Sequence, residues 1–236
     1  MKRSFFYVIW LIFLQLIFLS SSFAFQMAEY WPIKAGNLSI FDNEILATGS
    51  NTQTFGAYNA HKMFFGSTFC GTLCGGHFYF YLGAEGLLGV SVYEDGGSVD
   101  FSATPIKLFT AEMQIGESVI STVPAGVLDD DPLSFTATLL AEETIIVPAG
   151  TFTDTLVLEL FVVDSPTSQY TEKLWLAKGV GPVKIERVSE LPTTTHEGCF
   201  FTCGSFDLGT ENVVQRVIEL EDFFSQRKGA VVIPLF

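Results

Sequence analysis

Two short segments carry all four cysteines of the chain and two of its three histidines. They read FCGTLCGGH at residues 69–77 and HEGCFFTCG at residues 196–204. Each contains C-x-x-x-C with a histidine three residues from one cysteine, and the second segment repeats this pattern in reverse. Such residues can bind zinc or copper(I), form disulfides or carry redox chemistry. The rest of the sequence indicates which of these three roles, metal binding, a disulfide or redox chemistry, is expected.

The N-terminus predicts export. Lys2 and Arg3 precede an apolar run over 5–19, and the small-residue site Ser-Phe-Ala follows. These are the three parts of a secretory signal peptide, and the run is shorter than the ~20 residues that span a bilayer. We therefore expect a signal peptide over 1–24, no membrane span after its cleavage, and one periplasmic or extracellular domain over 25–236.

In an exported chain, an even number of cysteines predicts disulfides first. We expect two bridges among the four cysteines, which are Cys70, Cys74, Cys199 and Cys203. If the two segments run antiparallel, Cys70 faces Cys203, Cys74 faces Cys199, and the two histidines also fall in register. This is our preferred pairing. Local Cys70–Cys74 and Cys199–Cys203 rings are the alternative, and they require each segment to turn, because a bridge needs Cα atoms ~4.4–6.8 Å apart.

The same segments contain an alternative set of metal ligands, namely Cys70, Cys74, His77, His196, Cys199 and Cys203. Against a metal site, C-x-x-x-C differs from the usual C-x-x-C knuckle, and exported thiols tend to oxidise. Against a redox centre, neither segment is C-x-x-C at a strand-to-helix junction. We expect disulfides, no metal and no other cofactor.

The composition describes an acidic chain that is apolar enough to fold. It has 26 acidic and 12 basic residues, 48% hydrophobic residues and 24 Phe. Without the two basic residues of the signal peptide the balance is 10 against 26, a net charge of −16, which repels nucleic acid. The sequence contains no G-x-S-x-G, H-E-x-x-H, P-loop or EF-hand loop. We assign no catalytic residue and do not expect an enzyme.

Short β-rich runs separated by turn residues predict strands over 77–82, 87–93, 98–103, 134–147, 154–164, 170–177, 182–188 and 212–220. GAEG and EDGG between the first three carry the Gly and Asp of tight turns. A helix competes only over 105–113. We therefore predict a mainly β fold with little helix after the signal peptide. The expected form is a single antiparallel curved sheet or half-barrel, with a β-sandwich as the alternative.

Three blocks of the sequence recur elsewhere. They are EYWPIKAGNLSIFD (29–42), TIIVPAGTFTDTLVLEL (144–160) and EKLWLAKGVGPVKIER (172–187). In these blocks the chain resembles a bacterial family of secreted proteins and lipoproteins of unknown function, with Y-x-P-l-x-x-G-N, V-P-A-G-T-F and W-x-A-x-G-V-G-x-V-K motifs. The resemblance implies a curved antiparallel sheet similar to the half-barrel of Lol-type lipoprotein carriers. The chain departs from the family at 38–40, where LSI replaces a Trp and another aromatic, and the cysteine segments lie outside the pattern.

Trp175, in the third block, is the candidate for ligand contact, and packing in the core or at its rim is its alternative role. A curved sheet rich in Phe can hold a hydrophobic ligand on its concave face. We therefore predict an exported, non-enzymatic binding or carrier module whose ligand is a lipid or another hydrophobic small molecule. The alternative is a structural or surface domain, stabilised by disulfides, that meets a protein partner.

Overall fold

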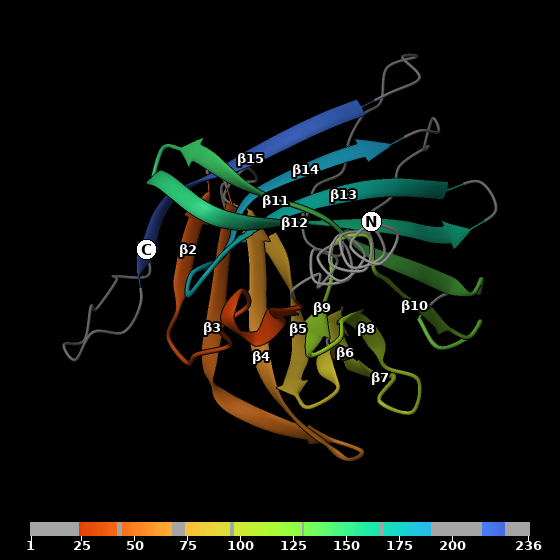
Figure 1. Ribbon diagram of the computed structural model, residues 1–236. Coiled ribbons are helices and arrows are strands. Elements are labelled where there is room, and N and C mark those ends of the chain that lie inside the picture. The colour runs from red at the N-terminus through yellow and green to blue at the C-terminus, as the bar shows by residue number, and fades with distance from the viewer. Residues whose placement is uncertain are drawn as a thin grey trace, which may run out of the picture.

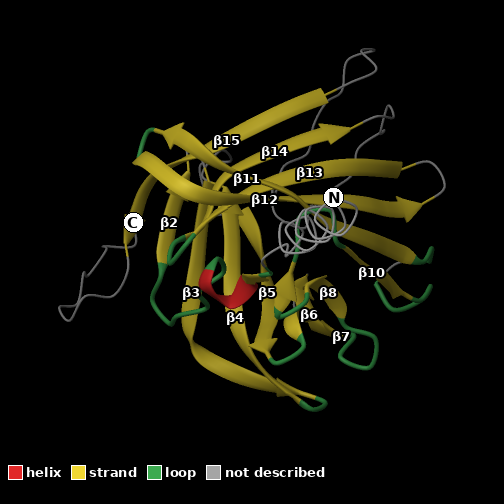
Figure 2. Ribbon diagram, in the orientation of Figure 1, coloured by secondary structure: helices red, strands yellow, loops and turns green. Residues whose placement is uncertain are grey.

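Antiparallel β-strands dominate the part of the chain that the computed structural model describes, which is residues 24–41, 44–67, 74–94, 97–128, 130–165, 168–189 and 214–224 (Figure 1, Figure 2). The helical element among them is a 3-10 turn, η1 (Met27–Glu29). The strands before residue 101 are β1 (Phe25–Gln26), β2 (Leu38–Phe41), β3 (Glu44–Phe55), β4 (Tyr58–Ser67), β5 (Cys74–Gly83), β6 (Gly86–Glu94) and β7 (Gly97–Asp100). Those after it are β8 (Ile106–Phe109), β9 (Glu112–Met113), β10 (Ser118–Val123), β11 (Leu133–Val147), β12 (Gly150–Ser165), β13 (Ser168–Ala177), β14 (Gly181–Ser189) and β15 (Val214–Phe224).

One sheet bends back over itself to enclose the core. Its path is β10-β11-β12-β13-β14-β15-β2-β3-β4-β5-β6-β7, and β8 pairs with β6 beside that path. β15 joins the two halves, because its first part pairs with β14 and its last part pairs with β2. In Figure 1, β11–β15 lie across the top and β2–β8 below them. The prediction of a mainly β, antiparallel, curved sheet is confirmed.

Alternation places large apolar side chains inside the bend. On β12, Leu156, Leu158 and Leu160 are fully buried. Glu159 and Phe161, which point to the other face of the strand, are partly exposed. The largest fully buried side chains come from both halves of the sheet and from the segment after η1: Trp31, Phe41, Phe80, Phe109 and Phe135. Burying each such side chain contributes roughly 1.5–3 kcal/mol, so this shared core holds the two halves together.

The segment 105–113 differs from its sequence expectation, because it forms two short strands and no helix. β8 pairs with β6, and β9 pairs with β1. Ile106, Leu108 and Phe109 are all fully buried in the main core, because the register shift between the pairs Leu88–Lys107 and Leu87–Phe109 leaves Leu108 as an extra residue in β8. A strand with such an irregularity lacks the alternation by which strands are recognised. No helix within the described residues is long and apolar enough to cross a membrane.

A second, smaller apolar cluster lies on the outer face of β4–β6. The hairpin of β3 and β4 bends at a register shift between Thr48 and Thr52. Phe55, near the tip of this hairpin, lies 4.8 Å from the ring of Tyr79 on β5. Tyr79 faces away from the main core, to which its neighbour Phe80 belongs. The bent hairpin therefore covers the lower part of this outer face and leaves the part near the start of β5 less covered.

Candidate functional site

Of the six cysteine and histidine residues in the predicted set, four lie outside the described residues. These four are Cys70, His196, Cys199 and Cys203. Cys74 begins β5, with its backbone opposite Ser67 of β4. The strand ends that flank the two segments, Ser67 with Cys74 and Ser189 with Val214, lie at the same end of the sheet, because neighbouring strands alternate in direction. Three strand spacings, about 14 Å, separate β15 from β4, and the register places Ser67 level with Leu220, which lies about 20 Å along β15 from Val214. The disulfide pairing stays a prediction, and the preferred form has to cross this distance.

His77 and the position of Cys74 fall on opposite faces of β5. Positions 74, 76, 78 and 80 alternate with 77 and 79, and Phe78 and Phe80 belong to the main core. Among the described residues, no three His, Cys, Asp or Glu side chains group closely enough to hold a metal ion.

His77 lies in a lateral row of rings on the outer face. Phe64 of β4 stands opposite it on one side and Tyr93 of β6 on the other. The ring centroids of Phe64 and Tyr93 are 5.0 Å and 6.0 Å from that of His77. Lys62, two residues before Phe64, places its Nζ atom 5.7 Å from the centre of the Tyr93 ring. We call Lys62, Phe64, His77 and Tyr93 the histidine–aromatic row.

The row combines exposed apolar surface, an uncharged imidazole and one cation. Tyr93 is 38% exposed, and the other three side chains are partly exposed. The pKa of His77 is lowered, first by burial and then by the charge of Lys62, so its imidazole is neutral at pH 7. Its Nδ1 atom is buried without a hydrogen-bond partner. Ring faces attract apolar groups and an ammonium attracts anions, so this arrangement is suited to binding.

Replacing His77 with Phe is expected to remove an acid sensitivity of the fold. The folded-state pKa of His77 lies below the ordinary 6.5, so below pH 6.5 the unfolded chain binds more protons than the folded one. The contribution of His77 to the free energy of unfolding is therefore intact above pH 6.5 and declines as the pH falls through that value. Urea unfolding at about pH 7.5 and pH 5 measures the free energy of unfolding at each pH. The decrease between the two values should be smaller for H77F than for the natural protein.

His61→Phe is the matched control for this comparison. His61 pairs with Phe80 on the neighbouring strand and lies on the core side of β4, away from the row. H61F keeps His77 and should keep its contribution to the acid sensitivity. An unchanged acid-induced loss in H77F would contradict the assignment of that sensitivity to His77.

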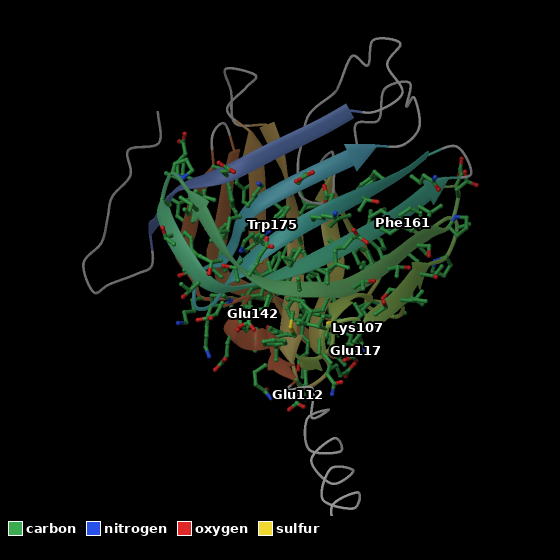
Figure 3. All side chains as sticks on the ribbon, turned by 45° about the horizontal axis from the view of Figure 1, so that its top comes forward. Lys107, Glu112, Glu117, Glu142, Phe161 and Trp175 are labelled. Atoms are coloured by element: carbon green, nitrogen blue, oxygen red, sulfur yellow. The ribbon has the colours of Figure 1, made fainter. Side chains whose placement is uncertain are left out.

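Trp175, labelled in Figure 3, alternates on β13 with the fully buried Leu174 and Leu176, and side chains from two other strands contact it. It is 8% exposed, and its Nε1–H group donates a hydrogen bond to the Glu143 carboxylate. The Nζ atom of Lys184 lies 4.9 Å from the centre of the indole ring and 3.5 Å from a Glu219 carboxylate oxygen. Contact between Trp175 and a ligand remains a prediction, and it would require Lys184 to move aside.

The first and third of the three sequence blocks meet beside η1. Glu29 of the first block pairs with Lys178 of the third, with 2.6 Å between Nζ and Oε2. The Gly179 N–H group donates to the Glu29 carbonyl at 2.7 Å. Between these blocks and β11, burial raises the pKa of Tyr30, and the charge of Glu142 adds to the effect. The blocks thus join the segment before β2 to the β13–β14 turn, which is a structural role.

A small recess lies beside this junction. Its walls come from the first and third blocks and from β2–β4: Trp31, Pro32, Asn37, Ser39, Leu46, Thr48, Met63, Val180, Gly181 and Pro182. Its volume of about 20 Å³ suffices for one water molecule. Asn37, Ser39 and Thr48 are its polar lining, and all three are more than nine-tenths buried. This recess is too small for an acyl chain.

Sequence reasoning identified His77 but not its neighbours Lys62, Phe64 and Tyr93 as part of one site. Strand alternation within 58–64 would have placed Lys62 and Phe64 on one face, but that segment was not among the predicted strands. It also passed over Glu172, which is fully buried on the core face of β13 beside Leu174. Alternation in YTEKLWLA was the available signal, because it places position 172 with the two inward leucines.

Comparison with known proteins gives two structural likenesses. No protein-family model matches the chain, and no curated protein matches it. A protein from Bacteroides fragilis, described as exported and as having a YmcC-like fold, is similar with a TM-score of 0.41 and 11% identity, over 83% of this chain and 98% of that one. A lipoprotein from Parabacteroides distasonis is similar with a TM-score of 0.34 and 11% identity over the same shares. Neither likeness assigns an activity or a site.

Proposed function

We propose that the protein is an exported, non-enzymatic binding module that takes an amphipathic ligand with an anionic end on the histidine–aromatic row. The observation that carries the proposal is the row itself, in which three rings lie side by side on three neighbouring strands with an ammonium group next to them. Export rests on the basic, apolar and small-residue parts of the N-terminal sequence.

The interior is the less favourable place for a hydrophobic ligand. In the described part of the chain, buried aromatic and aliphatic side chains from both halves of the sheet form one core cluster, and the recess beside η1 has room for one water molecule. A ligand there would have to displace buried aromatic and aliphatic side chains. On the outer face, Tyr93 already presents apolar surface to solvent, so no core residue has to move.

Local charge favours an anionic group at this position. The chain has 26 acidic and 12 basic residues, so an anion is repelled over much of its surface. In the row, Lys62 adds a positive charge and the neighbouring His77 is neutral. An anionic head near Lys62 and an apolar tail along Phe64 and Tyr93 would satisfy both parts of the site.

Laurate and the uncharged lauryl alcohol are suitable probes, with binding measured by isothermal titration calorimetry on the exported protein. Laurate should bind the natural protein more tightly than lauryl alcohol does. Lys62→Met keeps an apolar stem without the charge and should weaken laurate binding about tenfold, which is 1.4 kcal/mol. Tyr93→Ala should weaken both probes.

Lys173→Met is the matched control, because Lys173 also forms a surface ion pair, with Glu159 at 3.7 Å, but lies on β13 away from the row. K173M should bind both probes as the natural protein does. Absence of laurate binding, or laurate binding that neither K62M nor Y93A alters, would overturn the proposed site.

A further inference from the structure

Strand β10 ends one side of the sheet. It pairs with β11 through six residues, from Ser118 opposite Thr138 to Val123 opposite Leu133. Within the described part of the chain, no strand forms a ladder with its other edge. The backbone N–H and C=O groups along such an edge are the groups to which another strand pairs.

Besides its partner β11, β10 also contacts β8, which meets it from the core side. The Ser121 hydroxyl accepts a hydrogen bond from the Lys107 N–H group at 2.8 Å and lies 3.3 Å from the Lys107 carbonyl, to which it donates. Ser121 shares its face of β10 with Val119 and Val123, which pack against the main core. β8 is therefore held by a side chain directed inward, and it leaves the backbone edge of β10 open.

β10 lacks the features by which proteins protect an edge strand. Lys residues, proline, inward charges and bulges discourage pairing with another chain. The sequence of β10 is SVISTV, which is uncharged and has no proline, and its pairing with β11 is unbroken. Ile120 at its centre is 72% exposed. The outer-face row that continues from Ile120 through Thr136 to Phe161 is also uncharged.

We propose that β10 pairs edge to edge with β10 of a second copy of this chain, antiparallel and around a two-fold axis at Ile120. In that register Ile120 packs against the partner's Ile120, and Ser118 lies opposite the partner's Thr122. A two-fold contact brings each central residue close to its own copy, so a charge near the axis would repel itself. β10 carries no charge, which fits a second copy in an otherwise strongly acidic chain.

This pairing has a characteristic dependence on salt. Two copies of a chain with a large negative charge repel each other at long range, and salt screens that repulsion beyond about 8 Å at 0.15 M ionic strength. The contact itself consists of backbone hydrogen bonds and apolar side chains, which screening does not weaken. The dimer should therefore tighten as salt is added.

Sedimentation equilibrium of the exported protein at low and physiological salt tests the proposal, with native mass spectrometry to count the copies. We expect a dimer that tightens with salt and that Ile120→Lys weakens at least tenfold. Ile146→Lys is the matched control, because Ile146 is 75% exposed on the neighbouring strand β11 but away from the free edge. I146K should dimerise as the natural protein does.

A monomer at all concentrations up to about 100 μM, a dimer that I120K leaves intact, or an open polymer in place of a closed pair would each overturn the proposal. Unfolding curves of both variants should match that of the natural protein, because Ile120 and Ile146 are exposed. Laurate binding by I120K should be unchanged, so failure of the dimer and failure of the proposed ligand site are distinguishable.

Discussion

Replacing Gly86 with Ala is expected to destabilise the fold by at least about 4 kcal/mol, which approaches the whole stability of a typical domain. A Cβ atom at this position would lie 1.8 Å from the Phe109 carbonyl oxygen and 2.7 Å from the Thr110 Cα atom. Both contacts are to backbone, so no side-chain rotation relieves them. Gly86 begins β6, and the next residue, Leu87, pairs with Phe109 of β8. The methyl group would force β8 away from β6 and open the core at Phe109.

Gly116→Ala separates this clash from backbone strain. Gly116 has φ of +88° and Gly86 has φ of +109°, so both are unfavourable for an L side chain. No heavy atom lies within 4 Å of a Cβ atom at Gly116. G116A should cost only about 1–2 kcal/mol, the cost of the left-handed conformation. Urea unfolding of the two variants measures the difference, and equal losses would contradict the role assigned to the packing against Phe109.

Local alternation made the second half of the sheet predictable from sequence. In TLVLELFVV, the three leucines fall on one face, and all three are fully buried in β12. The hairpin turn of AKGVGPVK likewise lies between β13 and β14, where Gly179 and Gly181 have positive φ. These elements pair with their neighbours in the chain, so local patterns carry the information that positions them.

Two strands of the first half, β3 and β8, were less predictable because they are not alternately buried. β3 has four successive exposed residues over 51–54, in the polar run NTQT, and its hairpin with β4 contains a register shift. β8 contains a register shift at Leu108, so its three apolar residues are all buried in the main core. Neither strand has the period of two that distinguishes a half-buried strand, so propensity and pattern give no clear signal there.

The candidate site depends on register between strands, which a single sequence does not reveal. His77 was noticed for its spacing from a cysteine, but its ring packs with Phe64 and Tyr93 from the two neighbouring strands. A shift of one residue in either pairing would move these rings to the opposite face. Trp175 shows the same limit, because its hydrogen-bond partner Glu143 lies 32 residues away in the chain.

Replacing Trp31 with Ala is the second change with a large expected effect, a loss of about 3–5 kcal/mol. Trp31 follows η1, is 2% exposed, and lies with its ring centroid 6.4 Å from that of Phe80 and 6.3 Å from that of Phe109. Its removal leaves a cavity between the two halves of the sheet. Trp175→Ala should cost less, because part of the Trp175 contacts are with the polar side chains of Glu143 and Lys184, which water can hydrate in its place.

The milder Trp31→Phe variant separates structure from binding at the junction of the first and third sequence blocks. Phe fills most of the indole volume, so W31F should remain folded, with a smaller loss in urea unfolding than W31A. The recess beside Trp31 holds about 20 Å³, and the histidine–aromatic row lies on the opposite face of the sheet. Folded W31F should therefore bind laurate as the natural protein does. A folded W31F that loses laurate would contradict the assignment of the binding site to the outer rings, because Trp31 lies on the core side of the sheet.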